Sequence, residues 1–72
     1  MTFPERARAL SALIDKLGYK KGSLVTREIG VDPSTYWLWE NAKRNPGKAA
    51  RLSFDRLEAR LKAEAEDRGI AA

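Results

Sequence analysis

The 72-residue chain contains neither cysteine nor histidine. Without cysteine, no disulfide and no thiolate metal site can stabilise the fold. Without histidine, the chain lacks the commonest general base and the commonest metal ligand. The closely spaced carboxylates Glu64 and Glu66 would lie on different faces of a helix, so no catalytic pair is visible. We therefore expect a protein that is not an enzyme and that binds no cofactor and no metal.

Long apolar runs are also missing. No segment approaches the ~20 apolar residues that span a bilayer, and the charged pair Glu5-Arg6 occupies a place where a signal peptide would be apolar. We expect no membrane partner. A hydrophobic fraction of 43% suits a folded domain. The length fits a single domain over residues 1–72, which would bury only ~60% of its unfolded surface and would gain from a partner chain.

Positive charge is concentrated in the middle of the chain. The net charge is +4. Residues 16–48 hold seven basic and three acidic residues, whereas residues 51–72 hold five of each. This asymmetry is typical of a protein that binds a polyanion such as nucleic acid. Spare lysines that serve only solubility would give a similar count.

The first half of the chain predicts two helices. Thr2 and Glu5 match a capping box, and apolar residues at helical spacing follow, so we expect a first helix over about Phe3–Leu17. A short apolar set then stops at Gly30, whose tolerance of positive φ suits a tight turn. Only one or two helical turns fit before that glycine.

The second half predicts two more helices. Asp32 followed by Pro33 is the clearest helix start in the chain, and this helix should end near Lys43. Ser53 suits the N-cap of a C-terminal helix over about 53–68. No segment alternates with period two for long enough to predict a strand. The sequence therefore predicts an all-α, compact four-helix domain.

The segment from Gly30 to Pro46 reads GVDPSTYWLWENAKRNP. It has a Gly-Val turn, a Ser-Thr pair, an aromatic residue followed by Glu, and a basic-Asn-Pro exit. In these features it resembles the turn and recognition helix of the Cro/CI-type (XRE) helix-turn-helix family, with a weaker likeness from Gly22 onward. The resemblance implies a lambda-repressor-like fold whose helix-turn-helix unit covers about residues 22–44.

The resemblance also implies a role for each matching position. The side chains that fix the angle between the two helices would be Val25, Ile29, Val31, Tyr36 and Trp39, with Thr26 where the family prefers a small residue. The side chains that face DNA bases would be Ser34, Trp37 and Leu38, with Asp32 and Pro33 at the edge of the groove. The residues that meet phosphates would be Lys21, Gly22, Ser23, Asn41, Lys43 and Arg44.

The chain departs from the family at three places. Gly22 stands where the family usually has a phosphate-binding glutamine. The family often pairs the Glu40 position with an arginine of the first helix, and at that spacing this chain has Ile14 or Asp15. We expect that pair to be absent unless Arg6, Arg8 or Lys16 substitutes. The stretch Gly47–Leu52 resembles an insertion before the last helix, and the family's fifth helix is missing.

Trp37 and Leu38 leave three interpretations open. An apolar side chain can read a thymine methyl, so both residues could press on methyls or sugars while Ser34 makes the polar contact. Exposed tryptophan is also enriched in protein-binding hot spots. Alternatively, the helix is rotated and one of the two residues belongs to the core. The apolar stripe Phe54, Leu57 and Leu61 is similarly open, because it could form a dimer seam or pack on the domain's own core.

These observations predict a sequence-specific transcriptional regulator, more often a repressor, from a bacterium, a phage or another mobile element. We expect a homodimer that occupies a palindromic operator in double-stranded DNA. Its location would be cytoplasmic and nucleoid-associated. The alternative function is a small helical adaptor or inhibitor, of the phage or plasmid anti-activator type, that binds a protein partner through Trp37 and Leu38.

Overall fold

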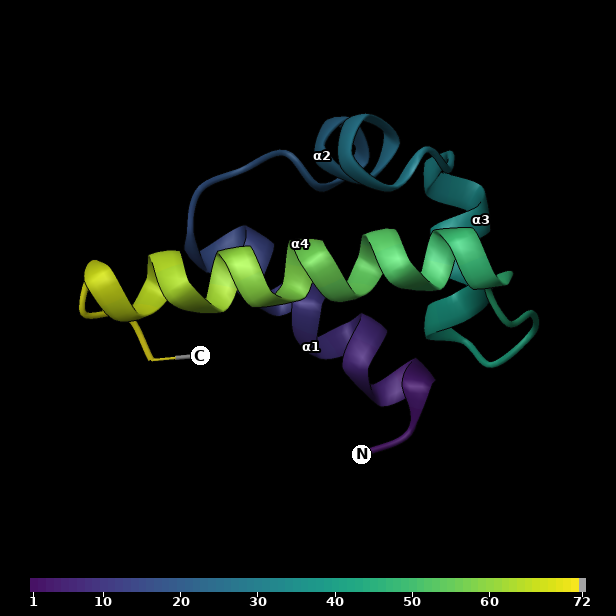
Figure 1. Cartoon of the computed structure of the whole chain (residues 1–72), viewed down its shortest axis with the longest axis horizontal. Helices are drawn as coiled ribbons and strands as arrows, with labels where there is room; N and C mark the ends of the chain where they lie inside the picture. The colour runs from purple at the N-terminus through teal and green to yellow at the C-terminus, as the bar shows by residue number, and fades with distance from the viewer. Residues whose placement is uncertain (72) are drawn as a thin grey trace.

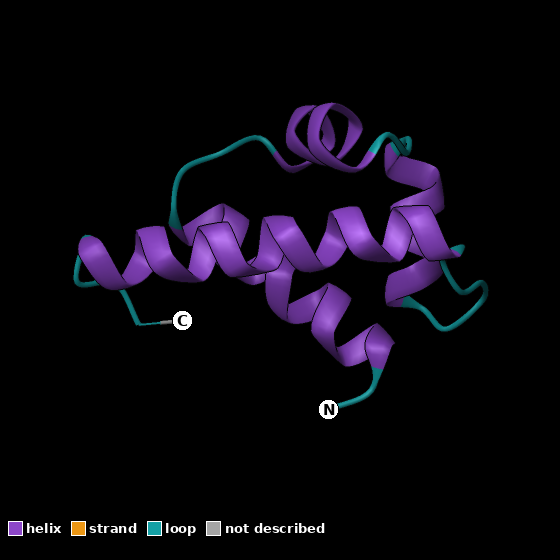
Figure 2. Ribbon diagram, viewed as in Figure 1, coloured by secondary structure: helices purple, strands orange, loops and turns teal. Residues whose placement is uncertain are grey.

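The computed structural model describes residues 1–71, which form four α-helices and no strand. Figures 1 and 2 show their arrangement. The helices are α1 (Phe3–Lys16), α2 (Lys21–Ile29), α3 (Pro33–Glu40) and α4 (Lys48–Asp67). The predicted all-α class and the four-helix count are confirmed. No helix in this part of the chain is both long and apolar enough to cross a membrane.

Two predicted helix starts are confirmed by their side-chain caps. At the start of α1, the Thr2 hydroxyl accepts from the Glu5 backbone at 3.4 Å, and the Glu5 carboxylate accepts from the Thr2 backbone at 3.0 Å. At the start of α3, the Asp32 carboxylate accepts from the Thr35 backbone at 2.9 Å. Each cap satisfies backbone donors that have no partner within the helix.

Two predicted helix boundaries are wrong. Helix α3 ends at Glu40 rather than near Lys43, because Ala42 adopts a positive φ of 57° and the Lys43 backbone donates back to the Leu38 carbonyl at 2.8 Å. This is the hydrogen-bond pattern of a Schellman motif, which glycine usually completes. Helix α4 begins at Lys48 rather than at Ser53, so the stretch after Gly47 is the start of that helix and not an insertion.

The long helix α4 supplies one wall of the core, and α1 and α2 pack against it. Its apolar stripe faces this core: Phe54, Leu57 and Leu61 are 0%, 2% and 1% exposed. A dimer seam through these three residues is therefore a wrong prediction. So small a domain needs the stripe for its own core, and the side chains lie out of reach of a second copy.

Four aromatic side chains hold α3 against the other helices. The Phe3 ring lies 5.8 Å from Trp39 and 4.8 Å from Phe54, measured between ring centroids. The Tyr36 ring lies 5.6 Å from Trp39 and 6.5 Å from Phe54. Both aromatic residues of α3 in this cluster are buried, so the orientation of α3 is set by large apolar contacts on one side.

Arg6 ties α1 to α4 at the surface of the core. Its guanidinium lies 2.6 Å from a Glu58 carboxylate oxygen and 2.8 Å from an Asp55 carboxylate oxygen. Hydrogen bonds to these two carboxylates raise the pKa of Arg6 above its already high value. Arg6 is thus engaged with α4 and does not serve as the partner of Glu40.

Candidate nucleic-acid interface

The turn between α2 and α3 consists of Gly30, Val31 and Asp32. Gly30 adopts the left-handed conformation with φ of 82°, as the sequence predicts, and its N–H bonds to carbonyls of the last turn of α2. The Thr26 hydroxyl donates to the Val31 carbonyl at 3.1 Å and braces the turn. The turn therefore fixes the direction in which α3 leaves α2.

The first turns of α2 and α3 approach each other closely. A Cβ built on Gly22 would lie 3.3 Å from Cγ of the Pro33 ring, which is tighter than ordinary van der Waals contact. This contact gives a physical reason for glycine at a position where the resembling family usually has glutamine. Because both residues belong to the first turn of their helices, the positive ends of both helix dipoles lie near each other.

Four of the five residues expected to fix the angle between α2 and α3 are buried. Val25, Ile29, Tyr36 and Trp39 are at most 8% exposed. Val31 is half-buried and packs against the core from the turn. These placements agree with the register that the resemblance implies. Thr26 differs, because it is exposed and acts through its hydrogen bond to the turn rather than as a small spacer between the helices.

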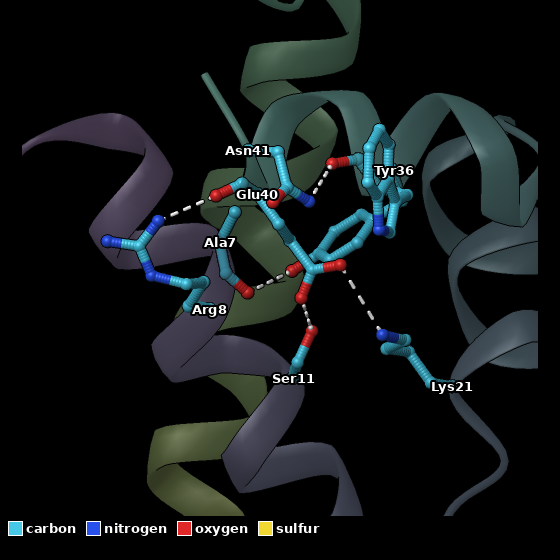
Figure 3. Close-up of polar contacts among 8 residues, drawn as sticks. Ala7, Arg8, Ser11, Lys21, Tyr36, Glu40 and Asn41 are labelled. Carbon is cyan, nitrogen blue, oxygen red and sulfur yellow. Dashed lines mark hydrogen bonds and ion pairs between the residues drawn. The ribbon is translucent and has the colours of Figure 1, made fainter. Parts of the chain in front are cut away.

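Glu40, at the end of α3, is buried and has partners from two helices (Figure 3). Its carboxylate accepts a 2.6 Å hydrogen bond from the Ser11 hydroxyl of α1 and lies 3.4 Å from the Lys21 ammonium of α2. Its backbone carbonyl accepts from the Arg8 guanidinium at 2.6 Å. Arg6, Arg8 and Lys16 were the candidates to replace the family's arginine. Of these only Arg8 contacts Glu40, and its guanidinium bonds to the backbone carbonyl of Glu40 rather than to the carboxylate.

Ser11 and Lys21 are the partners of Glu40 that the sequence interpretation did not identify. A signal for Ser11 was present, because it precedes Ile14 and Asp15 by about one helical turn and so shares their face of α1. Lys21 gave no such signal. Its contact with Glu40 depends on how the first turn of α2 meets the end of α3.

Lys21 is directed toward α3 rather than outward. Besides its contact with Glu40, its ammonium lies 5.8 Å from the centroid of the Tyr36 ring. Figure 3 shows the side chain aimed at the Glu40 carboxylate. Lys21 was predicted to face phosphates, but the buried Glu40 carboxylate balances part of its positive charge. It therefore contributes less to an anion site than a lysine without such a partner would.

The opposite side of α3 is open to solvent. Ser34 is exposed, and Trp37 is 54% exposed, which is high for so large an apolar side chain. Leu38 is half-buried, and Asp32 and Pro33 are exposed at the start of the helix. The interpretation in which α3 is rotated to put Trp37 in the core is wrong. The candidate base-facing residues therefore share one solvent-facing side of the unit.

The candidate phosphate-facing residues beyond α3 are exposed. Lys43 and Arg44 lie outside the helix, and neither forms an ion pair with another residue of 1–71. Asn41 is exposed too, but its amide donates to the Trp37 carbonyl at 2.9 Å and so also caps α3. The Arg44 charge and the capping bond from Thr35 both lower the pKa of Asp32, the Thr35 bond more strongly.

The first turn of α2 contributes backbone donors. The N-cap residue Lys20 makes no side-chain capping bond, and Gly22 and Ser23 follow in the first turn. The N–H groups of such a turn have no partner within the helix and carry the positive end of its dipole. A helix start of this kind is suited to phosphate groups. Within residues 1–71 no group of three or more acidic side chains could hold a metal ion.

No model of a known protein family matches the chain, and comparisons with curated proteins and with solved structures find no match either.

Proposed function

We propose that the chain is a sequence-specific double-stranded DNA-binding protein that uses α2 and α3 as a helix-turn-helix unit. One observation carries the proposal: the close approach of Gly22 and Pro33 brings the first turns of the two helices together. In helix-turn-helix proteins the second helix enters the major groove while the first crosses the backbone. The exposed side of α3, which includes Ser34 and Trp37, would then meet base edges.

The contacts divide into two kinds. Phosphates would be bound by the first turn of α2 and by Lys43 and Arg44, and these contacts set affinity and register. Bases would be read by Ser34 through hydrogen bonds and by Trp37 and Leu38 through thymine methyl groups. The charge supports this division, because residues 16–48 hold seven basic and only three acidic residues, and one of the three, Glu40, is buried.

The mechanism proposed is occupancy of an operator. A homodimer would place one α3 in each of two successive major grooves of a palindromic site, with half-sites ~34 Å apart, and would exclude polymerase from a promoter. The protein would then be a repressor of the Cro/CI (XRE) type from a bacterium or a phage. It would act in the cytoplasm at the nucleoid, where its partner is double-stranded DNA.

Selection from a random pool of short duplexes tests the proposal. Repeated capture by the protein should enrich a palindromic sequence. Replacing Ser34 by Ala should relax the base preference at one position of each half-site and leave the salt dependence unchanged. A pool that shows no enrichment after repeated capture would contradict sequence-specific binding.

A second function is favoured by one observation, the 54% exposure of Trp37 on a helix that presents no arginine, lysine or glutamine. In this alternative α3 is a protein-binding surface with Trp37 as its anchor, and the chain is an adaptor or inhibitor. Trp37→Ala discriminates between the two. A regulator loses operator binding, whereas an adaptor loses its protein partner and keeps its weak affinity for DNA.

A further inference from the structure

The exposed side of α3 lacks the side chains that usually form directed hydrogen bonds to bases. Residues 33–40 include no arginine, lysine, asparagine or glutamine, which are the residues that bind guanine or adenine through two hydrogen bonds. Glu40 is the one charged residue of the helix, and it is buried against Ser11 and Lys21. An α3 that lies in the major groove therefore has to distinguish bases mainly by apolar contact.

Apolar surface dominates this side of the helix. Trp37 is 54% exposed and follows Pro33 by four residues and Ser34 by three, so the three side chains share one face. Pro33 is exposed as well, and Leu38 is half-buried beside Trp37. In the major groove, the base group that an apolar side chain recognises is the C5 methyl of thymine.

The polar groups around Trp37 are either occupied or unselective. The Asp32 carboxylate, which could accept from a cytosine, already accepts from the Thr35 backbone at 2.9 Å. The Asn41 amide donates to the Trp37 carbonyl at 2.9 Å and so cannot give an adenine both of its hydrogen bonds. The Ser34 hydroxyl is exposed, and it can donate to O4 of thymine or accept from the amino group of cytosine. Hydrogen bonds from these side chains therefore do little to separate thymine from cytosine.

We infer that α3 recognises the C5 methyl group itself, so that 5-methylcytosine is accepted in place of thymine. The inference rests on the proposed function and names the class of base that Trp37 selects. Both bases carry the methyl at the same ring position and present it at the same place in the major groove. They differ at C4, where the Ser34 hydroxyl suits either group. The purine opposite each base offers an N7 acceptor in both pairs.

Binding would then respond to modification of the DNA. A site with cytosine at a contacted position would be bound weakly when unmodified, and more tightly once a methyltransferase has added a methyl group at C5. Burial of one methyl group corresponds to about fourfold in affinity. The phosphate contacts are the same in both forms of the site, so the salt dependence should not change.

Competitive capture from three pools of random short duplexes tests the inference. The first pool contains thymine and cytosine, the second contains uracil and cytosine and so has no C5 methyl, and the third contains uracil and 5-methylcytosine. Limiting protein is mixed with all three at about 50 mM salt. For each methyl contacted, the second pool should be captured about fourfold less than the first. The third pool should be captured as well as the first.

Two variants connect this preference with α3. Trp37→Ala should capture the three pools alike, because its phosphate contacts remain while the methyl contact is lost. The side chain is 54% exposed, so this variant should melt like the parent. The matched control is Leu52→Ala, which removes an apolar side chain that is 51% exposed on α4, outside the helix-turn-helix unit. It should keep the preference of the parent.

Three results would overturn the inference: a parent protein that captures the three pools equally, a preference for thymine that 5-methylcytosine does not restore, or a Trp37→Ala variant with the preference of the parent. Equal capture of all pools would contradict this inference and leave DNA binding standing. Failure to capture any pool would contradict the proposed function, and the inference with it.

Discussion

The Tyr36 hydroxyl donates a 2.7 Å hydrogen bond to the backbone carbonyl of Ala7 and thereby ties α3 to α1 (Figure 3). Both residues are fully buried. Burial raises the pKa of the Tyr36 hydroxyl well above its ordinary value, so the hydroxyl stays protonated and remains a donor at neutral pH. The bond adds a polar tie between α3 and α1 to the ring contacts that Tyr36 makes on the same side of α3.

Replacing Tyr36 by Phe should remove this hydrogen bond and keep the ring contacts. We expect a loss of about 1 kcal/mol in the free energy of unfolding, the usual value for one buried hydrogen bond. Denaturant titration measures it directly. A variant as stable as the parent would show that the ring contacts alone position α3.

Replacing Gly30 by Ala should destabilise the protein by about 1 kcal/mol, because a side chain is strained at a positive φ. A loss of that size would lower the melting temperature by about 4–8 °C in a domain of this length. The matched control is Gly47→Ser, where φ is −69° and no atom lies within 4 Å of an added Cβ. Serine is a good N-cap, so this variant should melt at or above the parent temperature. Equal melting temperatures for the two variants would contradict the strained turn.

Asp32 should make the stability of α3 depend on pH. The capping bond from Thr35 holds the pKa of this carboxyl below its ordinary value of 3.8. A depressed pKa means that the ionised form is favoured in the folded state, so the stabilisation is present above about pH 4 and is lost as the pH falls through the folded-state pKa. Asp32→Asn should therefore lower the melting temperature at pH 7 and have little effect near about pH 2.

The control for that comparison is Asp15→Asn. Asp15 is an exposed carboxylate near the C-terminal end of α1, where a negative charge interacts unfavourably with the helix dipole. This variant should not melt below the parent at pH 7. If Asp32→Asn had the same effect at both pH values, the stabilisation would come from hydrogen-bond geometry and not from the charge.

Lys21 and Arg44 should differ in their effect on DNA binding. Each free cation that neutralises a phosphate contributes about 0.9 to the slope of log affinity against log salt. Arg44→Ala should lower the slope by about that amount. Lys21→Ala should lower it by less, because Glu40 lies 3.4 Å from the Lys21 ammonium and already balances part of its charge. Equal changes in slope would mean that Lys21 leaves Glu40 when DNA binds.

The sequence predicted the features of the fold that depend on neighbouring residues. The cap at Asp32 and the left-handed turn at Gly30 follow from local backbone chemistry and were found as expected. The start of α4 was missed because its N-cap, Gly47, has no side chain to form a capping bond. Ser53 matched the cap pattern but lies inside the helix.

Features that depend on contacts between distant residues were predicted less well. The periodicity of Phe54, Leu57 and Leu61 identified an apolar stripe but could not tell a core from a dimer seam. Burial of all three decides in favour of the core. The pairing of Lys21 with Glu40 likewise depends on how two helices pack. The exposure of Trp37 was one of the alternatives that the sequence left open.

Fluorescence anisotropy with labelled duplex DNA at about 50 and 200 mM salt tests the central claim most directly. If four or more phosphates are contacted, affinity should fall by about 100-fold or more between the two conditions. The double variant Lys43→Ala/Arg44→Ala should bind more weakly to every sequence and show a slope smaller by about 2. Absence of binding by the parent at the lower salt, or a double variant that binds as well as the parent, would contradict the account.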